Sequence, residues 1–438
     1  MPLPKISQVV DDDLCIACGA CIPTCPYQNV ATSFSPFRGA EEIAISDPDI
    51  CANCDAPCDT VCPSIEVDFA DIRRVRNGNI PEPAPQRTGW IRQVILGAAP
   101  THRDGPVSSS GGVIRALIEE ALVNGTPVLC LAKRPGDEKY GPCLLTSPTD
   151  LQYLPGSIYH SVSFAGAIEL LRSAERPVML VAIPCHLEGV LNYARTMDKE
   201  ILEKIACICG IVCGWMYSHH SLAAFARYNG IDSAIEDATY RGGDRVGKLR
   251  FMSGGKSYAF ERRHFSNVKD LINYQSSFST DYNRLRCRVC EDHLNMLADV
   301  IAGDAWLERT KTEKISVIAT RTEVGDALIA NLANKGKIEL EAGSFEDLIE
   351  SQSSNLVLGT KAREINAIMR EQGKVTPTFH FADVLDKPIG DAGRKSFSHE
   401  MKRRGLIRNR HYLFYRLLYV FRRWRPIASH LRRALKGA

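Results

Sequence analysis

Apolar positions between residues 90 and 185 alternate between short continuous runs and runs with helical spacing. The short runs predict buried strands, the last of which ends at Pro184 and Cys185. Apolar side chains spaced three to four residues apart predict amphipathic helices between them. The strands are expected at residues 90–98, 126–132 and 177–183, and the helices at residues 113–123 and 165–172. This alternation predicts an α/β core.

The pattern changes in the second half of the chain. Residues 238–262 are rich in glycine and β-forming residues and predict antiparallel hairpins. Residues 315–332 predict a strand followed by a helix. The pattern weakens after residue 351, and residues 372–400 are expected to be irregular. A polar, proline-rich stretch at residues 81–86 predicts a linker.

Near the C-terminus, residues 411–425 again follow a helical pattern. The apolar positions that would share one face of this helix are Leu413, Leu417, Val420, Phe421 and Trp424. Pro426 would end the helix. The segment is too short and too charged to cross a bilayer, but the pattern suits a helix lying in a membrane interface.

Charge separates this tail from the rest of the chain. Residues 401–438 contain 12 Lys and Arg and no Asp or Glu, which leaves 42 basic and 51 acidic residues in the remainder, a net charge of −9. The tail is therefore expected either to contact a membrane surface peripherally or to dock on the acidic body or on a partner subunit. Nucleic-acid binding is not expected, because no recognised module accompanies the charge.

Composition is ordinary for a globular protein, with 45% hydrophobic and 24% charged residues among 438. The N-terminus lacks the pattern of a signal peptide, so a cytoplasmic location is expected. The chain contains 16 cysteines. In a reducing compartment, clustered cysteines indicate metal ligands rather than disulfides.

Eight of the cysteines form two runs, each closed by Cys-Pro. The first has the spacing C-x2-C-x2-C-x3-C-P and the second C-x2-C-x3-C-x3-C-P, with an extra residue between Cys54 and Cys58. Such runs predict two [4Fe–4S] clusters, in which the fourth cysteine of each run ligates the other cluster. Zinc fits this spacing poorly. The expected ligand sets are Cys15, Cys18, Cys21 and Cys62 for one cluster, and Cys51, Cys54, Cys58 and Cys25 for the other.

A further C-x2-C pair, Cys287 and Cys290, is a weak signal on its own. With Cys185 and Cys213 it could hold a third cluster, but buried cysteines of this kind are often simple apolar residues. Spacing alone leaves both possibilities open. Cys130 and Cys143 are expected in the core, and His186, His219 and His220 are expected to be structural more than catalytic.

The run SSSGG at residues 108–112 opens the helix expected at 113–123. Exposed N–H groups at a helix N-terminus can hold a phosphate. Serine–glycine runs are mostly ordinary loops, however, so the run is a weak signal by itself.

Several segments occur in an order that resembles the family of the coenzyme F-420 hydrogenase/dehydrogenase beta subunit, in the version with a ferredoxin domain at the N-terminus. The resemblance covers about residues 10 to 340. The most specific block is CRVCEDHLNMLADVIAGDAW at residues 287–306. The others are SSSGGVIRALIEEAL (108–122), GSIY (156–159), VAIPCHLEGVL (181–191), GIVCG (210–214) and IATRTEVGDAL (318–328).

The resemblance implies an enzyme that binds FAD beside a [4Fe–4S] cluster. It assigns Cys185, Cys213, Cys287 and Cys290 to a third cluster, and Ser109, Ser110, Gly111 and Gly112 to the flavin. His186 departs from the family, because relatives more often carry Gln after the cysteine. The electron donor would be coenzyme F-420 or reduced ferredoxin. Relatives that use ferredoxin reduce chlorophyll-type substrates.

The expected architecture is an α+β ferredoxin-like N-terminal module, an α/β flavin-binding core and a helical basic C-terminal tail. The corresponding segments are residues 1–80, 87–175, 176–345 and 346–438, the middle two matching the N-terminal and C-terminal parts of the family. The expected function is an oxidoreductase that transfers electrons through FAD and [4Fe–4S] clusters. The alternatives are an electron-carrier subunit of a larger complex and a cluster-bearing structural or sensing protein.

Overall fold

The computed structural model describes residues 3–55, 57–78, 88–105, 107–243, 247–262, 265, 267–381 and 390–423. The expected linker at residues 81–86 and the part of the tail from Trp424 onward lie outside the described residues. Among the described residues, no helix combines the length and apolarity needed to cross a bilayer.

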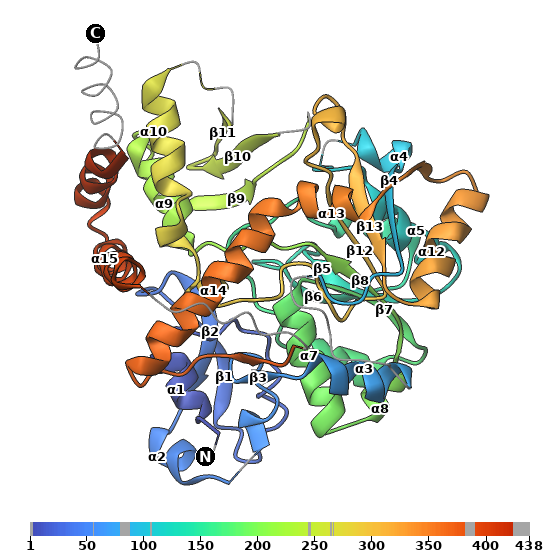
Figure 1. Ribbon diagram of the computed structural model, residues 1–438, viewed down its shortest axis with the longest axis horizontal. Coiled ribbons are helices and arrows are strands. Elements are labelled where there is room, and N and C mark those ends of the chain that lie inside the picture. Colours follow the sequence, from blue (N-terminus) through green and yellow to red (C-terminus); the bar gives the residue numbers. More distant parts are fainter. Residues whose placement is uncertain are drawn as a thin grey trace.

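The centre of the protein is a mixed eight-stranded sheet (Figure 1). Strands β12, β8, β7 and β5 run parallel, while β6 at one edge and β13, β4 and β14 at the other are antiparallel to their neighbours. In spatial order the strands are β14 (Glu339–Ala342), β4 (Gln93–Ala98), β13 (Ser316–Thr320), β12 (Val300–Asp304), β8 (Ile205–Ile211), β7 (Val178–Ala182), β5 (Val128–Ala132) and β6 (Gly141–Leu145). The expected boundary between residues 175 and 176 therefore falls between strands of a single sheet.

Both faces of this sheet are covered, which explains why its central strands are continuously apolar. On one face Val128 and Met179 pack with the helices α5 and α12. On the other face Leu129 and Leu180 pack with α7, in the same core that includes the N-terminal module. The helices of this core are α4 (Pro100–Arg103), α5 (Val113–Val123), α6 (Ala167–Ser173), α7 (Pro184–Thr196), α8 (Glu200–Glu203), α12 (Glu323–Asn334) and α13 (Phe345–Ser351), with 3-10 turns η2 (Pro148–Tyr153) and η4 (Glu308–Thr310).

The N-terminal module (blue in Figure 1) is built from short elements joined by cysteine-containing turns. These are α1 (Ile6–Asp11), β1 (Val30–Ser35), β2 (Ala40–Ile45), α2 (Pro48–Asn53), η1 (Pro57–Asp59), β3 (Glu66–Val67) and α3 (Phe69–Asn77). A segment from far along the chain holds the module to the body. Strand β15 (Thr378–Phe379) pairs in parallel with β3, and the rings of Phe379 and Phe381 stack on Phe69.

A smaller three-stranded antiparallel sheet lies beside the main sheet, as the hairpin pattern predicted. Two helices pack against it through an aromatic cluster that includes Phe225, Phe251 and Tyr274. The elements of this region are α9 (His219–Tyr228), β9 (Ile235–Thr239), β10 (Lys248–Ser253), β11 (Lys256–Glu261), α10 (Val268–Ser277), η3 (Thr280–Tyr282) and α11 (Leu285–Arg288).

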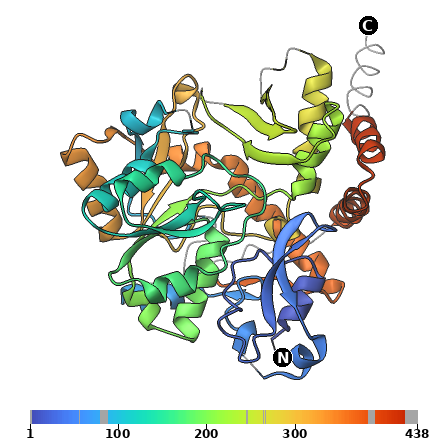
Figure 2. The same ribbon diagram turned by 180° about the vertical axis from the view of Figure 1, so that it is seen from behind.

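The C-terminal part is more ordered than its sequence pattern suggested. Helix α14 (Ser353–Glu371) is followed by α15 (Asp391–Arg408), so the irregular structure expected over residues 372–400 is wrong from Asp391 onward. A final helix covers residues 412–423 and lies at the edge of the molecule in both views (Figures 1 and 2). Ion pairs dock this region on acidic residues of the body, including Arg403 with Asp281 and Arg408 with Asp13.

In the last helix, the side chains that pack on the body are not those of the expected apolar face. Tyr412, Tyr415 and Tyr419 are buried, whereas Leu413 and Phe421 are exposed. The tyrosines prevail because the hydroxyl groups of Tyr412 and Tyr415 find hydrogen-bond partners on the body while their rings are buried.

Candidate functional site

The structure brings four cysteines of the N-terminal module together: Cys15, Cys18, Cys21 and Cys62. Burial raises the pKa of Cys21 well above its usual value, and the neighbouring thiols of Cys18, Cys15 and Cys62 raise it further. Burial likewise raises the pKa of Cys62, and Cys18 and Cys15 add to that effect. Thiols buried and grouped in this way would need a bound cation to be stable as thiolates.

A second group surrounds Cys58. Burial raises the pKa of this thiol to about 12, followed by the effects of Asp59 and of the thiols of Cys51, Cys54 and Cys25. Cys21 of the first group also interacts with Cys58, so the two groups are neighbours. Of the residues between Cys54 and Cys58, Pro57 begins the 3-10 turn η1.

Backbone N–H groups point at several of these sulfur atoms. Ala17 and Ile43 each donate to Cys15 Sγ at 3.4 Å, and Asn29 donates to Cys25 Sγ at 3.3 Å. Such donors stabilise thiolates and are one of the means by which proteins set cluster potentials. The residues of the module thus fit iron–sulfur clusters.

A third group lies in the body, where three segments of the chain meet. Cys185 is the second residue of α7, Cys213 follows β8, Cys287 lies in α11, and Cys290 comes shortly after it. Burial raises the pKa of Cys213, and Cys287 and Cys290 raise it further. Burial also raises the pKa of Cys185, with Cys213 and Cys287 contributing. Met216 N–H donates to Cys287 Sγ at 3.3 Å, so this group offers the same kind of environment as the module.

No three His, Cys, Asp or Glu side chains in the described part of the chain converge on the position of a single metal ion. The grouping of the cysteines therefore rests on the interactions between their thiols and on the N–H donors that face them.

The first and third cysteine groups lie on two sides of a close contact between α7 and the N-terminal module. Gly189 of α7 approaches the module so closely that a Cβ atom there would lie 2.7 Å from Cys18 Sγ. Beside it, Arg286 and Glu188 form a completely buried ion pair, with Nη2 and Oε2 3.2 Å apart. Arg286 also donates to the Pro63 carbonyl at 2.9 Å. Pro63 follows directly after Cys62, so Arg286 connects the cysteine loop of the module with the segment that carries Cys287.

A cavity of about 540 Å³ opens beside the third group. Its walls come from the loop before α5, the turn at residues 156–160, the ends of β7, β8 and β12, and the loop at Arg241. The wall nearest the third group includes His186, Cys213 and Met216. This is a typical volume for a ligand pocket, and strand ends are a typical place for one in an α/β protein.

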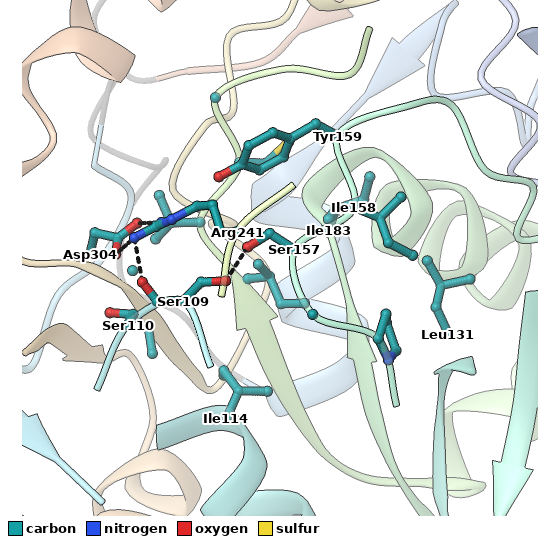
Figure 3. A pocket seen from close by; sticks show the side chains of 18 of the residues that line it. Ser109, Ser110, Ile114, Leu131, Ser157, Ile158, Tyr159, Ile183, Arg241 and Asp304 are labelled. Carbon is teal, nitrogen blue, oxygen red and sulfur yellow. Dashed lines mark hydrogen bonds and ion pairs between the residues drawn. The ribbon is translucent and has the colours of Figure 1, made fainter. Parts of the chain in front are cut away.

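A chain of polar contacts crosses the cavity wall (Figure 3). Arg241 makes two contacts with Asp304, at 2.5 and 3.0 Å, and also donates to the Ser109 carbonyl. Ser157 Oγ donates to Ser109 Oγ at 2.7 Å. The Arg241 side chain is 3% exposed, so a positive charge is held, already oriented, at a largely apolar cavity. Such a charge suits an anionic group of a ligand.

Of the four residues expected on the flavin side, three line the cavity: Ser109, Ser110 and Gly112. Gly112 has φ +79° immediately before α5, a conformation that glycine adopts without strain. Gly111 does not line the cavity. It packs against the sheet, where a Cβ atom would lie 2.6 Å from the Gly97 carbonyl oxygen. The N-terminus of α5 opens onto the cavity through Val113 and Ile114.

The remaining histidines and cysteines mostly have structural surroundings. His220 contacts the Tyr412 hydroxyl at 2.9 Å and the Phe37 carbonyl at 3.1 Å. Cys130 and Cys143 face each other across β5 and β6 in the sheet. Cys130 also lines the cavity, and so does His186, which follows Cys185 and stacks on Phe164 with the ring centres 5.0 Å apart. Burial lowers the pKa of His186 to about 4, which keeps the ring neutral at pH 7.

Sequence reasoning did not identify Arg241 as a site residue. Its only signal was a place in the glycine-rich stretch expected to form hairpins, and nothing local pairs it with Asp304, 63 positions away. Ser157 and Asp304 did lie in segments that carried the family resemblance, GSIY and GDAW. No role could be given to them until the fold placed them around one cavity.

Comparison with protein families gives two matches. Residues 14–65 match the 4Fe–4S dicluster domain. Residues 175–344 match the C-terminal domain of the coenzyme F-420 hydrogenase/dehydrogenase beta subunit. The first match contains all eight cysteines of the module, and the second contains Cys185, Cys213, Cys287 and Cys290.

Curated relatives agree with these matches. The chain is 23% identical over 342 residues to one of the subunits of the F(420)H(2) dehydrogenase of Methanosarcina mazei, covering 74% of this chain and 83% of the relative. It is 25% identical over 314 residues to the beta subunit of the coenzyme F-420 hydrogenase of Methanothermobacter thermautotrophicus, covering 66% and 99%. A third relative is the coenzyme F-420-dependent sulfite reductase of Methanocaldococcus jannaschii, at 22% identity, of which this chain spans 49%.

Among solved structures, a chain of the F-420-reducing [NiFe] hydrogenase complex from Methanosarcina barkeri matches with a TM-score of 0.48 and 16% identity, covering 65% of this chain and 94% of that chain. The family assignment rests on the sequence matches. Residues 14–65 are therefore a 4Fe–4S dicluster domain, and residues 175–344 belong to the family of the coenzyme F-420 hydrogenase/dehydrogenase beta subunit.

Proposed function

We propose that this protein is an iron–sulfur flavoprotein oxidoreductase that transfers electrons between a reduced donor, coenzyme F-420 or ferredoxin, and a separate acceptor. One observation carries the proposal. The cavity that contains the serine loop at Ser109 also has Cys213 of the third cysteine group in its wall. A flavin in this cavity would therefore lie beside a cluster, which is the arrangement that electron exchange between them needs.

In this proposal FAD would be held by Ser109, Ser110 and Gly112, with Arg241 and the N-terminus of α5 toward its anionic part. A bound flavin exchanges electron pairs with organic donors and single electrons with clusters. The apolar residues of the cavity exclude water. The Asp304 carboxylate fixes the direction of the Arg241 guanidinium, so the charge needs no reorientation when a ligand binds.

The three cysteine groups would form a path for electrons. Cys213 lines the cavity, Gly189 brings the third group against Cys18, and Cys21 neighbours Cys58. We infer the ligand sets Cys185, Cys213, Cys287 and Cys290; Cys15, Cys18, Cys21 and Cys62; and Cys51, Cys54, Cys58 and Cys25. Electrons would then pass between the cavity and the outer end of the module, where a protein partner could exchange them.

The first test is a cofactor analysis of anaerobically purified protein, covering flavin type, iron and acid-labile sulfide. We expect non-covalent FAD together with [4Fe–4S] clusters. Iron without flavin would favour the alternative function, an electron-carrier subunit of a larger redox complex. Two relatives support this alternative, since both are named as subunits. Turnover of an artificial electron acceptor by the isolated protein would distinguish the enzyme from the carrier.

The electron donor can be predicted from the three relatives, all of which are named for coenzyme F-420 or its reduced form. Reduced coenzyme F-420 or reduced ferredoxin should bleach the flavin absorbance under anaerobic conditions. A nicotinamide donor serves as the comparison in stopped-flow measurements. Rapid bleaching by the nicotinamide donor, with none by the other two, would contradict the proposed donor.

Filling the cavity should displace the flavin without disturbing the clusters. Ser157 contacts Ser109 at the cavity wall, so Ser157→Phe would place a ring in the proposed flavin space. Overpacking of this kind costs about 1–3 kcal/mol, which corresponds to roughly fivefold to hundredfold weaker binding. We expect less flavin per chain at unchanged iron content. Ser173→Phe, at an exposed position at the end of α6, is the matched control and should retain both.

A further inference from the structure

The last helix, residues 412–423, presents two different faces. Its inner face consists of Tyr412, Tyr415 and Tyr419, which are 6%, 0% and 7% exposed. These residues are fixed by polar contacts as well as by packing. Tyr415 donates to Asp281 at 3.1 Å, and the Tyr412 carbonyl accepts a hydrogen bond from the Tyr228 hydroxyl at 2.6 Å. The helix is thus docked, and its orientation on the body is defined.

The outer face carries five large apolar side chains in contact with solvent. Their exposed fractions are 68% for Leu413, 56% for Phe414, 49% for Leu417, 39% for Leu418 and 68% for Phe421. At 3.6 residues per turn these positions span about 140° of the helix circumference. Of residues 412–423, none that falls within this arc is charged. We call these five residues the outer apolar face.

Basic residues border the outer apolar face on both sides. On one side is Arg416, whose guanidinium lies 4.9 Å from the ring centre of Tyr228, and on the other is Arg422. No Asp or Glu occurs anywhere in residues 401–438 of the sequence. The inner arginines Arg403 and Arg408 are paired with acidic groups of the body, whereas Arg416 contacts the uncharged ring of Tyr228 and Arg422 is exposed. Two positive charges therefore lie beside the outer apolar face.

We propose that this face is a docking surface for an anionic membrane, on which the helix lies parallel to the lipid surface. Leucine and phenylalanine on one side with arginine at the borders is the composition of interfacial helices, in which the apolar side enters the headgroup region and the arginines contact lipid phosphates. The tyrosines, which are enriched in protein interfaces, are buried on the body instead. The helix lies at the edge of the molecule, beside α15 and α10 (Figures 1 and 2), where a flat surface can reach it.

This inference is independent of the proposed redox function, because it concerns location and not chemistry. The test is co-sedimentation of the full chain, purified anaerobically, with vesicles of phosphatidylcholine alone and of phosphatidylcholine containing a quarter phosphatidylglycerol. We expect binding to the anionic vesicles, and we expect it to weaken at high salt because surface charge is screened. Binding to the neutral vesicles should be weaker by about tenfold or more.

Two variants identify the surface responsible. Leu417→Glu with Phe421→Glu places two charges on the outer apolar face without touching the buried tyrosines, and should reduce vesicle binding by about tenfold or more. Val123→Glu with Val324→Glu adds the same charge at exposed positions of α5 and α12, which are 56% and 43% exposed, and should change it little. Both variants should keep the iron content and circular dichroism spectrum of the unmodified chain, which excludes unfolding as the cause.

Three results would overturn the proposal. One is no binding of the full chain to either vesicle. Another is binding that both double variants retain or lose equally. The third is self-association of the full chain, measured by light scattering, in the absence of vesicle binding. If Leu417→Glu with Phe421→Glu abolishes that self-association, the outer apolar face binds a second copy of the chain instead of a membrane.

Discussion

Replacing Cys287 and Cys290 together by serine is expected to remove about a third of the protein's iron. Three [4Fe–4S] clusters would contain roughly 12 iron atoms per chain, four for each set of four thiolates. In the structure these two cysteines neighbour Cys213. Burial raises the pKa of the Cys213 thiol, and the thiols of Cys287 and Cys290 raise it further. Serine leaves the packing nearly unchanged but supplies no thiolate. The signals of the two clusters in the N-terminal module should persist in electron paramagnetic resonance spectra of the reduced protein.

The chain offers a matched control for this variant. Cys130 and Cys143 are also two cysteines, of which Cys130 lines the cavity. They face each other across β5 and β6, however, and the thiol that affects the pKa of Cys130 is that of Cys143. Cys130→Ser with Cys143→Ser should therefore keep all of the iron. An iron content that stays the same in the Cys287 and Cys290 double variant would rule out the third cluster, and an equal loss in the control would show that the measurement reports general instability.

Local patterns predicted the secondary structure well where burial and periodicity agree. The helix expected at residues 113–123 begins and ends at Val113 and Val123 in the structure. The strand expected at residues 177–183 covers Val178–Ala182, all five of which are buried. The strand is part of the central sheet and the helix packs on that sheet. In both cases the apolar positions in the sequence correspond directly to the buried surface.

The tail shows what the same reasoning leaves undecided. Spacing grouped Leu413, Leu417 and Phe421 on one apolar face, but it left open whether that face meets a membrane, the body of the chain or a partner subunit. The structure buries Tyr412, Tyr415 and Tyr419 instead. Hydroxyl partners such as Asp281 lie more than a hundred positions earlier. No window of sequence contains that information, since it depends on which distant elements the fold places beside the helix.

The cysteine groups could be predicted from the sequence in part. Spacing within each run is a local property and predicted the two groups of the module. The third group joins Cys185, Cys213 and Cys287 from separate segments. Spacing left open whether these cysteines hold a cluster, and the resemblance to a family assigned them to one. Arg241 had neither kind of signal. Its place at the cavity depends on the pairing of its side chain with Asp304, a contact between a loop and the end of a central strand.

Replacing Arg286 by methionine is expected to destabilise the protein by about 3–5 kcal/mol, the usual effect of breaking a buried ion pair. The side chain of Arg286 is 1% exposed and that of Glu188 0%. Without the guanidinium, the Glu188 carboxyl loses its compensating charge and the Pro63 carbonyl loses a hydrogen-bond donor. Burial raises the pKa of Glu188 and Arg286 opposes that rise, so the loss of Arg286 would raise this pKa further. The loss can be measured from urea unfolding under anaerobic conditions.

Arg74→Met is the matched control, because Arg74 also pairs with a carboxylate but is 69% exposed. Its loss should cost no more than about 1 kcal/mol. Combining Arg286→Met with Glu188→Met replaces the whole pair by apolar side chains of similar size, and this variant should recover most of the lost stability. Equal stability of Arg286→Met and Arg74→Met would show that the buried pair contributes no more to stability than an exposed one.

The same pair of positions tests whether Arg286 lies between two clusters. Its positive charge neighbours the thiols of Cys290 and Cys185, which raise the pKa of Arg286 against the lowering effect of burial, and it contacts the Pro63 carbonyl beside Cys62. Reduction adds negative charge to a cluster, so a nearby cation stabilises the reduced form. In the Glu188→Met, Arg286→Met variant, which keeps its fold, the reduction potentials of two clusters should differ from those of the unmodified protein in a potentiometric titration. A shift confined to one cluster would instead place Arg286 at the edge of a single ligand set. Electron transfer between the module and the cavity would then need a different contact. Gly189, which lies beside Cys18, is the candidate for that contact.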